Sequence, residues 1–343
     1  MIEQEKTEVT ESQFPLVSPV QNPHDESSLM SDDSGASSTE TTPPSSGKAL
    51  ALLQLVRLPT VFSAGADIVL GFLLTSEHRT LEPSETFGLL LAASICLYWT
   101  GMILNDFFDR DVDAQERPGR PIPSGRVSAK TALVLALVLN LAGLGIASLV
   151  GNNSLLIAAA LTTTVWLYDS VLKKTPLAPL IMGSCRFFNV MLGASASPTG
   201  ELWCLPQAHV AAGFGIYIVG LTWFARQEAR TSSRNHLLAA TFVVNLGLCT
   251  LLAFLLHAPE RDQRTTSLFV LFVIAVTIIR RLIRAVSDPS PERVQVAVKI
   301  MLLSYITLSA SIILFAAADR TYAAAVAALL IPAFLLSRKI PMT

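Results

Sequence analysis

The sequence has few charged residues. Only 15% of its 343 residues are Asp, Glu, Lys or Arg, whereas 51% are hydrophobic, and the mean hydropathy is +0.52. A soluble domain carries about a quarter charged residues, so this composition argues against a soluble protein. We predict an all-α, polytopic membrane protein surrounded by membrane lipid, and we expect no nucleic-acid partner.

Cysteine and histidine are also scarce. The four cysteines lie in or beside apolar runs without a CxxC spacing, and the five histidines are scattered. These patterns argue against a disulfide framework, a thiolate metal site and a zinc site. Buried cysteines that pack like small apolar residues are the better interpretation.

The N-terminal segment lacks long apolar runs. Residues 1–47 are rich in Ser, Thr, Pro, Asp and Glu and contain one lysine, Lys6. Such a segment cannot bury enough apolar surface to offset its chain entropy, and it has neither the basic start nor the apolar core of a signal peptide. We predict that residues 1–47 are a disordered cytoplasmic tail and that residues 48–340 form the transmembrane domain.

Long apolar runs fill the rest of the chain. They fall near residues 56–76, 86–107, 129–150, 153–171, 176–196, 206–226, 236–257, 266–284, 295–317 and 320–338. Each is close to the roughly 20 residues that cross a bilayer core. The runs predict a bundle of nine to ten spans around a central apolar cavity, and only Ala318-Asp319-Arg320 separates the last two runs.

The distribution of basic residues on the two sides of the membrane tests this assignment of spans. Of the 25 Lys and Arg residues, twenty fall in the segments on the N-terminal side of the membrane, four fall in the opposite loops, and Arg186 lies inside a span. Cytoplasmic loops carry the excess of basic residues. We therefore expect the N-terminus to be cytoplasmic, the cavity to open to that face, and the membrane to be a bacterial inner membrane.

The most informative loop follows the second apolar run. At about 100° per residue, Asp106, Asp109 and Asp113 would share one face of a helix end, with Asp111 pointing away. Neighbouring carboxylates repel each other unless a cation lies between them, and Mg²⁺ prefers such hard oxygen ligands. The alternative is a solvated acidic loop. We predict that the three aspartates are metal ligands and catalytic residues.

Two later loops on the same predicted side are also polar. Lys173 and Lys174 could be topology anchors or point charges for a phosphate. Arg226 and Arg230 stand one helical turn apart with Glu228 between them. They could bind an anion or form a solvated helix end.

Two charges lie deep in the apolar runs. Asp67 is ten residues beyond Arg57, and Arg186 is about ten residues into its run, so each would sit about 15 Å inside the helix end. Ionisable groups at that depth normally have a partner. Either Asp67 and Arg186 form a structural ion pair, or Arg186, with Asn189 one turn on, marks the floor of an acceptor pocket.

These motifs resemble the UbiA superfamily of intramembrane prenyltransferases. Asn105, Asp106, Asp109 and Asp113 match its NDxxDxxxD motif, and Arg117, Arg120-Pro121 and Gly125 match the following R-x-x-RP-x-x-x-G pattern. The loop from Tyr168 to Lys174 resembles the Y-x-x-x-K-[KR]-T segment. The likeness covers roughly residues 50–317, and the local sequences around Arg57 and Arg226 are most similar to the EboC branch.

The resemblance implies Mg²⁺-dependent transfer of a prenyl group from an isoprenyl diphosphate to an apolar, aromatic or cyclic acceptor. The predicted catalytic residues are Asp106, Asp109 and Asp113 of the motif, together with Arg186, which is predicted from its depth in the bundle. The predicted diphosphate-binding residues are Asn105, Arg117, Arg120, Lys173 and Lys174, together with Arg226, Glu228 and Arg230 of the third polar loop. The chain departs from the family at the second aspartate-rich motif, where Leu221 and Ser232 stand in place of aspartates, and in its extra run over residues 320–338.

Other functions compete with this one. The EboC likeness and the degraded second motif also fit a non-catalytic component of secondary-metabolite or lipid transport. A purely structural membrane scaffold is a third hypothesis, which the three aspartates argue against.

Overall fold

The computed structural model describes residues 45–197, 202–203, 205–228, 231–259 and 261–337, and its described elements are all helical. They are α1 (Ser45–Leu55), the short turn η1 (Leu58–Thr60), α2 (Val61–Thr75), α3 (Ser84–Phe108), α4 (Arg110–Glu116), α5 (Ala129–Val150), α6 (Asn152–Ser170), the turn η2 (Leu172–Lys174), α7 (Ala178–Ala194), α8 (Leu205–Ala225), α9 (Arg234–His257), α10 (Arg264–Ser287), α11 (Pro291–Ala316), α12 (Arg320–Ala328) and α13 (Leu330–Ser337). The predicted tail over residues 1–44 lies outside this part of the chain.

All ten predicted apolar runs are helical. Within the described residues, seven helices are long and apolar enough to cross a membrane, while α7 and the last run are shorter. The last run is divided at Leu329 into α12 and α13, because Pro332 has no backbone N–H to donate to the preceding turn. The sequence did not predict α1, which begins at Ser45, inside the segment assigned to the tail.

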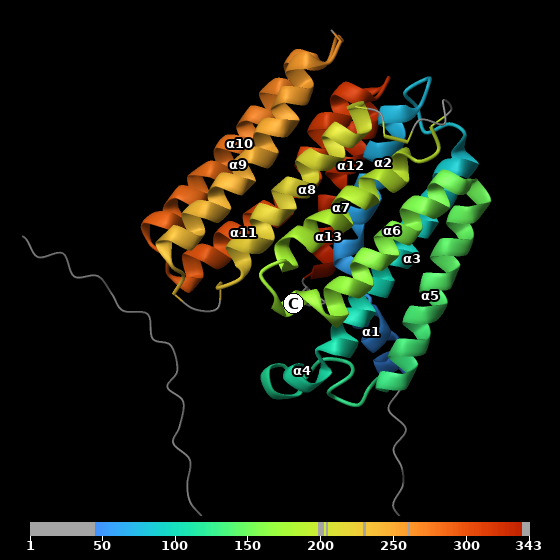
Figure 1. The fold of residues 1–343 in the computed structure, drawn as a ribbon, viewed down its shortest axis with the longest axis vertical. Coiled ribbons are helices and arrows are strands. Elements are labelled where there is room, and N and C mark those ends of the chain that lie inside the picture. Colours follow the sequence, from blue (N-terminus) through green and yellow to red (C-terminus); the bar gives the residue numbers. More distant parts are fainter. Residues whose placement is uncertain (1–44, 198–201, 204, 229–230, 260, 338–343) are drawn as a thin grey trace, which may run out of the picture. The chain divides into compact units, whose positions relative to one another are not determined.

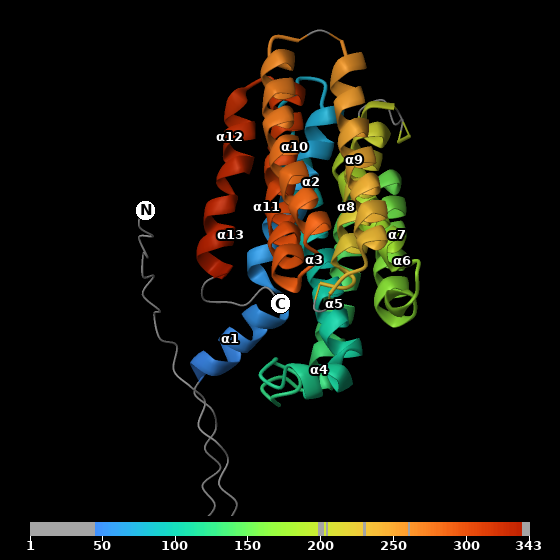
Figure 2. The same cartoon turned by 90° about the vertical axis from the view of Figure 1, so that its left-hand side faces the viewer.

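Helices that follow one another in the chain pack side by side. Each of α2, α3, α5, α6, α7, α8, α9, α10 and α11 contacts the next, and α11 returns to contact α2, which closes a ring. In Figure 1, α9 and α10 lie on one side of the bundle and α5 and α6 on the other. Figure 2 shows α12 and α13 outside this ring, where α12 packs against α11.

Two glycines bring α2 and α7 together across the ring. A Cβ at Gly71 would lie 2.1 Å from the carbonyl oxygen of Val190, and a Cβ at Gly193 would lie 2.6 Å from that of Ile68. Small residues permit this close approach between apolar helices. Asp67 lies one turn before Gly71, and Asn189 one turn before Gly193, so the same contact places polar groups of the two helices within reach of each other.

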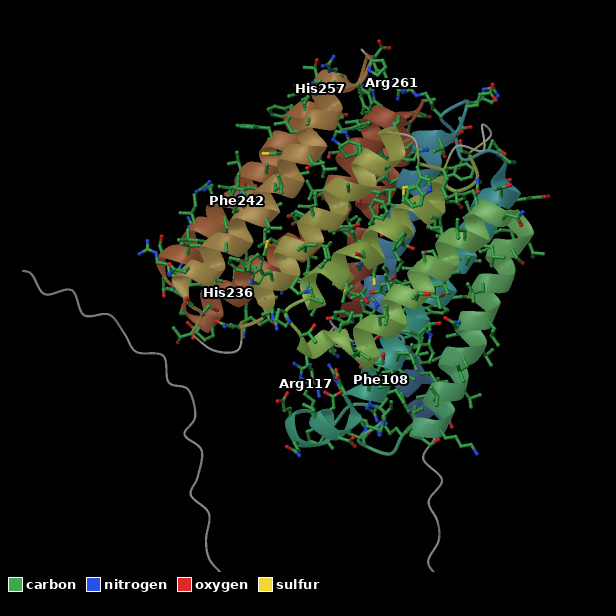
Figure 3. The ribbon with its side chains drawn as sticks, in the orientation of Figure 1. Phe108, Arg117, His236, Phe242, His257 and Arg261 are labelled. Carbon is green, nitrogen blue, oxygen red and sulfur yellow. The ribbon has the colours of Figure 1, made fainter. Side chains whose placement is uncertain are left out.

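The polar loops gather at the two ends of the bundle. Figure 3 shows Phe108, Arg117 and His236 at one end and His257 and Arg261 at the other. At the second end, Arg79 donates hydrogen bonds to three consecutive carbonyl oxygens of Phe315, Ala316 and Ala317. Those carbonyls lie at the C-terminal end of α11 and lack intrahelical partners, so Arg79 caps that helix.

Candidate active site

The first aspartate loop is a broken helix. α3 ends at Phe108, Asp109 is the residue between the helices, and α4 begins at Arg110. The sequence predicted that the three aspartates share one face of a single helix end. In the structure the helix is interrupted at Asp109 instead. Asp106 and Asp113 are both buried, and both bind the same guanidinium. Arg120 Nη1 lies 3.3 Å from Asp106 Oδ1 and 2.5 Å from Asp113 Oδ2.

Asp109 has a different partner. Lys173, on η2, donates to its Oδ2 and forms an ion pair. This contact joins the loop after α3 to the loop after α6, which the positive-residue pattern placed on one side. Lys174 is exposed beside it. Asp111 is also exposed, with 85% of its side chain accessible, in agreement with the prediction that it points away.

A hydrogen-bonded chain extends from these aspartates into the bundle. Arg57 Nη2 donates to Asp106 Oδ1 at 2.9 Å and to Asn105 Oδ1 at 3.2 Å. Asn105 in turn donates to Asp169 Oδ1 on α6 at 3.2 Å. With Arg120 and Asp113, six side chains from α3, α4, α6 and the loops before α2 and after α4 therefore fix one another.

The cations of this network occupy the space between the carboxylates. Within the described part of the chain, no three carboxylate, histidine or cysteine side chains are arranged to hold one metal ion. Arg57, Arg120 and Lys173 instead neutralise the aspartates. The donor set nevertheless fits Mg²⁺ chemically, because it consists of carboxylate oxygens and the Asn105 amide oxygen.

A basic cleft of about 290 Å³ opens beside Asp106. Arg117 and Arg120 line it from the loop after α4, and Arg57 lines it from the turn between α1 and η1. The arrangement can accept an anion of phosphate size, because guanidinium groups donate two parallel hydrogen bonds to such groups.

The loop after α8 lies at the same end of the bundle. Burial raises the pKa of Glu228, and the nearby Arg117 guanidinium partly opposes that rise. Ser232 is buried and its backbone N–H donates to the Pro289 carbonyl, so this loop also contacts the one after α10. Leu221 is buried within α8, Arg226 is exposed, and Arg230 lies outside the described residues.

An apolar cavity of about 130 Å³ lies between α3, α6 and α7. Asn105, Tyr168 and Asp169 line it at the end nearest the aspartate loop, and Arg186 and Asn189 line it further in. The other lining residues are Leu97, Tyr98, Gly101, Met102, Leu161, Val165, Met182 and Cys185. The cavity and the basic cleft thus share the Asn105–Arg57–Asp106 chain as their boundary.

The structure shows the ion pair that was one of the two alternatives for the deep charges. Arg186 Nη1 donates to Asp67 Oδ2 at 3.0 Å, which makes the predicted ion pair. Asn189 donates to the same oxygen at 2.9 Å, and the Tyr305 hydroxyl donates to Asp67 Oδ1 at 2.6 Å. Arg186 also lines the cavity, and its place at the floor of an acceptor pocket stays a prediction.

Sequence reasoning missed several members of the site. Neither Arg57 nor Asp169 was predicted as a site residue, yet they connect the cleft to the cavity. Asp169 stands four residues before Lys173, in the Tyr168–Lys174 segment that resembles a motif of the family. Tyr305 had no sequence signal, because a single tyrosine in an apolar run is normally a packing residue.

Comparison with known proteins assigns this chain to a family. Residues 68–306 match the model of the UbiA prenyltransferase family. The digeranylgeranylglyceryl phosphate synthase of Methanopyrus kandleri is 36% identical over 160 residues, which cover 45% of this chain and 58% of the relative. The enzyme of that name from Methanothrix thermoacetophila is 34% identical over 152 residues, covering 44% and 56%. The matched stretch thus spans little more than half the length of these curated relatives.

Solved structures show the same fold. A UbiA homologue from Aeropyrum pernix K1 aligns with a TM-score of 0.60 at 20% identity, covering 74% of this chain and 96% of that one. A homologue from Archaeoglobus fulgidus, bound to GPP and Mg²⁺, aligns with a TM-score of 0.59 at 14% identity, covering 81% and 99%. The likeness to the EboC branch stays a prediction. Because the family match covers more than half of the sequence, the chain belongs to the UbiA prenyltransferase family.

Proposed function

We propose that this protein transfers a prenyl group from an isoprenyl diphosphate to an apolar, ring-containing acceptor within the membrane, with Mg²⁺ as cofactor. The observation that carries the proposal is the position of the basic cleft next to the apolar cavity, with Asn105, Arg57 and Asp106 between them. A diphosphate ester with a hydrocarbon tail has these two halves. The names of the curated relatives and the GPP and Mg²⁺ bound to the Archaeoglobus homologue support the same reaction.

The basic residues would bind the diphosphate and stabilise its departure. Arg117 and Arg120 line the cleft, and Arg57 lies between the cleft and the cavity. Positive groups fixed where negative charge develops lower the barrier to bond cleavage. Arg57, Arg120 and Lys173 are ion-paired with aspartates, so a bound diphosphate would exchange these partners for phosphate oxygens. Lys174, Arg226 and Arg230 stay candidates for further contacts.

Asp106, Asp109 and Asp113 would hold the metal. Mg²⁺ bound there supplies Lewis-acid stabilisation of the leaving diphosphate. The Asn105 side chain would keep its present role, which is to fix the end of α3 against α6 through Asp169. The apolar walls of the cavity exclude water from the reacting prenyl carbon, since hydrolysis would compete with transfer.

The placement in the membrane follows the distribution of basic residues. We propose that the aspartate loop and the N-terminus face the cytoplasm and that the protein lies in a bacterial inner membrane. The loops that carry Asp109, Lys173 and Glu228 lie at one end of the bundle, and the sequence assigns that end most of the basic residues. The positive-inside rule makes it the cytoplasmic end.

The reaction is tested with purified protein in nanodiscs, labelled geranyl or geranylgeranyl diphosphate and a panel of ring-containing acceptors. Mg²⁺-dependent diphosphate release and a labelled acceptor product are expected. Asp106→Asn should reduce the rate by about 10²- to 10³-fold, in line with the loss of an electrostatic catalytic group. Asp111→Asn is the matched control, since its side chain is exposed, and it should retain the rate. Equal rates in both variants would contradict the proposed site.

A non-catalytic component of lipid or metabolite transport is the second candidate function. Two observations favour it: basic side chains already neutralise the aspartates, and buried Leu221 and Ser232 replace the aspartates of the second family motif. Binding of the labelled diphosphate without release, over a range of Mg²⁺ concentrations and acceptors, would favour this function over transfer.

A further inference from the structure

A separate basic cavity lies at the end of the bundle opposite the aspartate loop. It measures about 310 Å³ and lies between the ends of α2, α8, α9 and α11. Its basic lining residues are His209 on α8, His257 at the end of α9 and Arg261 in the loop that follows, and no described carboxylate lines it. Figure 3 shows His257 and Arg261 at this end of the bundle. The proposed reaction uses none of these groups.

Arg261 is the arginine of this cavity, and most of its hydrogen-bonding capacity is unused. Arg79 donates to three carbonyls at the end of α11, and Arg264 donates to the Leu256 carbonyl near the end of α9. Arg261, in contrast, makes one long hydrogen bond with the described residues, from Nη1 to the Phe315 carbonyl at 3.4 Å. A guanidinium carries five N–H donors. The described part of the chain therefore offers no acceptor for the other four.

The positive charge at this place is also unbalanced. Arg79 Nη2 lies 3.2 Å from the same Phe315 oxygen, so two guanidinium groups meet at one carbonyl. Neither forms an ion pair with a described carboxylate. Asp262, the next residue in the chain, is exposed, and residue 260 lies outside the described part. Burial and the Arg79 charge lower the pKa of Arg261, and an anion nearby would relieve both effects.

Aromatic rings form the floor of the cavity and fix the guanidinium above it. The guanidinium carbon of Arg261 lies 4.7 Å from the centre of the Phe315 ring. The Phe254 ring packs edge-on against Phe315 at 5.7 Å, and the His209 ring packs against Phe254 at 5.9 Å. The remaining walls are apolar and consist of Leu74, Pro206, Ala258 and Pro259. The cavity thus combines a fixed cation with hydrocarbon walls.

Both histidines keep one ring nitrogen for a ligand. His257 Nδ1 lies 2.8 Å from the Ala253 carbonyl oxygen, and His209 Nε2 lies 2.9 Å from that of Thr250. A carbonyl oxygen only accepts, so these two nitrogens carry the protons. The other nitrogen of each ring has no partner among the described residues. His257 is exposed, so its Nε2 can contact a group that enters from outside.

The cavity lies where a membrane helix ends. α9 is long and apolar enough to cross a membrane, and its last turns expose Leu252 and Leu256 on the outer surface. Because α9 ends at His257, the cavity lies at the boundary between hydrocarbon and water. A phospholipid presents a phosphodiester at that depth, and basic groups between membrane helices bind anionic lipid head groups. Its single negative charge matches one guanidinium, which can donate two parallel hydrogen bonds to it.

We propose that this cavity binds an anionic phospholipid of the leaflet opposite the aspartate loop, whose phosphate is held by Arg261 and His257 while an acyl chain lies against Leu74 and Phe254. The site is independent of the proposed transfer reaction. A zwitterionic lipid fits less well, because its ammonium group would lie beside Arg79 and Arg261. The bound lipid would connect the ends of α9 and α11.

Native mass spectrometry of the full chain in detergent tests the proposal. The wild type and Arg261→Met are mixed in equal amounts and titrated separately with dioleoylphosphatidylglycerol, dioleoylphosphatidylcholine, dioleoylglycerol and inorganic phosphate. Phosphatidylglycerol should bind the wild type about tenfold more tightly than it binds the variant, since hydrogen bonds to a charged group are lost. It should also bind the wild type more tightly than the other three ligands do.

Each ligand excludes one alternative. Equal affinity of phosphatidylglycerol for the two proteins would overturn the proposal. Phosphatidylcholine or dioleoylglycerol binding as tightly as phosphatidylglycerol would show that the charged head group is not recognised and would also overturn it. Inorganic phosphate binding as tightly would reveal a site for free anions in place of a lipid site.

Further variants locate the site and guard against misfolding. Arg261→Met should fold, because Arg79 still donates to the Phe315 carbonyl. Ala258→Phe fills the cavity and keeps Arg261, and it should likewise lose phosphatidylglycerol binding. Arg320→Met is the matched control, since Arg320 is exposed at the same end, and it should bind like the wild type. Wild-type affinity in Ala258→Phe, or a tenfold loss in Arg320→Met, would overturn the proposal.

Thermal unfolding gives an independent readout. A ligand that binds only the folded state raises the melting temperature. Phosphatidylglycerol should therefore raise the melting temperature of the wild type and of Arg320→Met more than that of Arg261→Met or Ala258→Phe. The same increase in all four proteins would show that the lipid acts elsewhere on the bundle and would overturn the proposal.

Discussion

Lys173 forms an ion pair with Asp109, although 64 residues separate them in the sequence. The pair connects η2 with the junction of α3 and α4, so the loops after the second and fourth predicted spans act as one unit. Both side chains are only partly buried, with 24% and 22% accessible. They can therefore exchange partners when an anion or a metal ion arrives.

The first prediction concerns this pair. Lys173→Met should weaken binding of the isoprenyl diphosphate about tenfold, because a hydrogen bond to a charged group contributes about 1.5–3 kcal/mol. Titration of labelled donor into protein in nanodiscs measures the effect. Lys130→Met is the control, since Lys130 is exposed at the start of α5. Equal donor affinity in the two variants would remove Lys173 from the site.

The deep ion pair gives a prediction about stability. Arg186→Leu or Asp67→Leu leaves one buried charge without its partner, and such changes cost about 3–5 kcal/mol. The double variant Asp67→Leu/Arg186→Leu should recover most of this loss, since no charge is left to bury. Thermal unfolding of the purified protein measures all three. If the two single losses simply add in the double variant, the charges stabilise the bundle independently and the pair is not the cause.

The positions of the helices along the chain could be predicted from sequence, and most side-chain pairs could not. Apolar runs reveal membrane helices because each helix must satisfy its own backbone hydrogen bonds in lipid. The depth of Asp67 and Arg186 likewise predicted a partner for each. The ion pair of Arg57 with Asp106, in contrast, depends on how α2 meets α3, which no periodicity specifies.

The failures have equally local causes. The aspartate spacing predicted one helical face, but the helix is interrupted at Asp109 and Arg120 occupies the space between Asp106 and Asp113. The run over residues 320–338 was treated as one helix, although Pro332 lies within it. Asp169 was overlooked because a lone carboxylate beside two lysines is indistinguishable from a solvated helix end until Asn105 is seen to bind it.

A pH dependence follows from Glu228. Burial raises its pKa above the usual value, with Arg117 acting in the opposite direction. An acid whose pKa is raised on folding destabilises the folded state above its unfolded pKa, which is near 4.5, and has no such effect once both states are protonated. Glu228→Gln should therefore raise the melting temperature at pH 7.5 and leave it unchanged at pH 4. The same increase at both pH values would show that ionisation of Glu228 is not the cause.

Arg79 gives the last prediction, at the other end of the bundle. Its side chain donates to the final carbonyls of α11, and its backbone N–H and carbonyl lie in a left-handed turn with φ of 58°. Arg79→Ala removes these hydrogen bonds and should destabilise the protein by about 2 kcal/mol, because the carbonyls regain only part of their hydrogen bonding from water. Arg320→Ala is the control, since Arg320 is exposed at the same end. Donor binding should be unchanged in both variants, because the cap lies at the opposite end of the bundle from the aspartate loop. A loss of donor affinity in Arg79→Ala at a temperature where the protein stays folded would show that the two ends are coupled through α2 and α11.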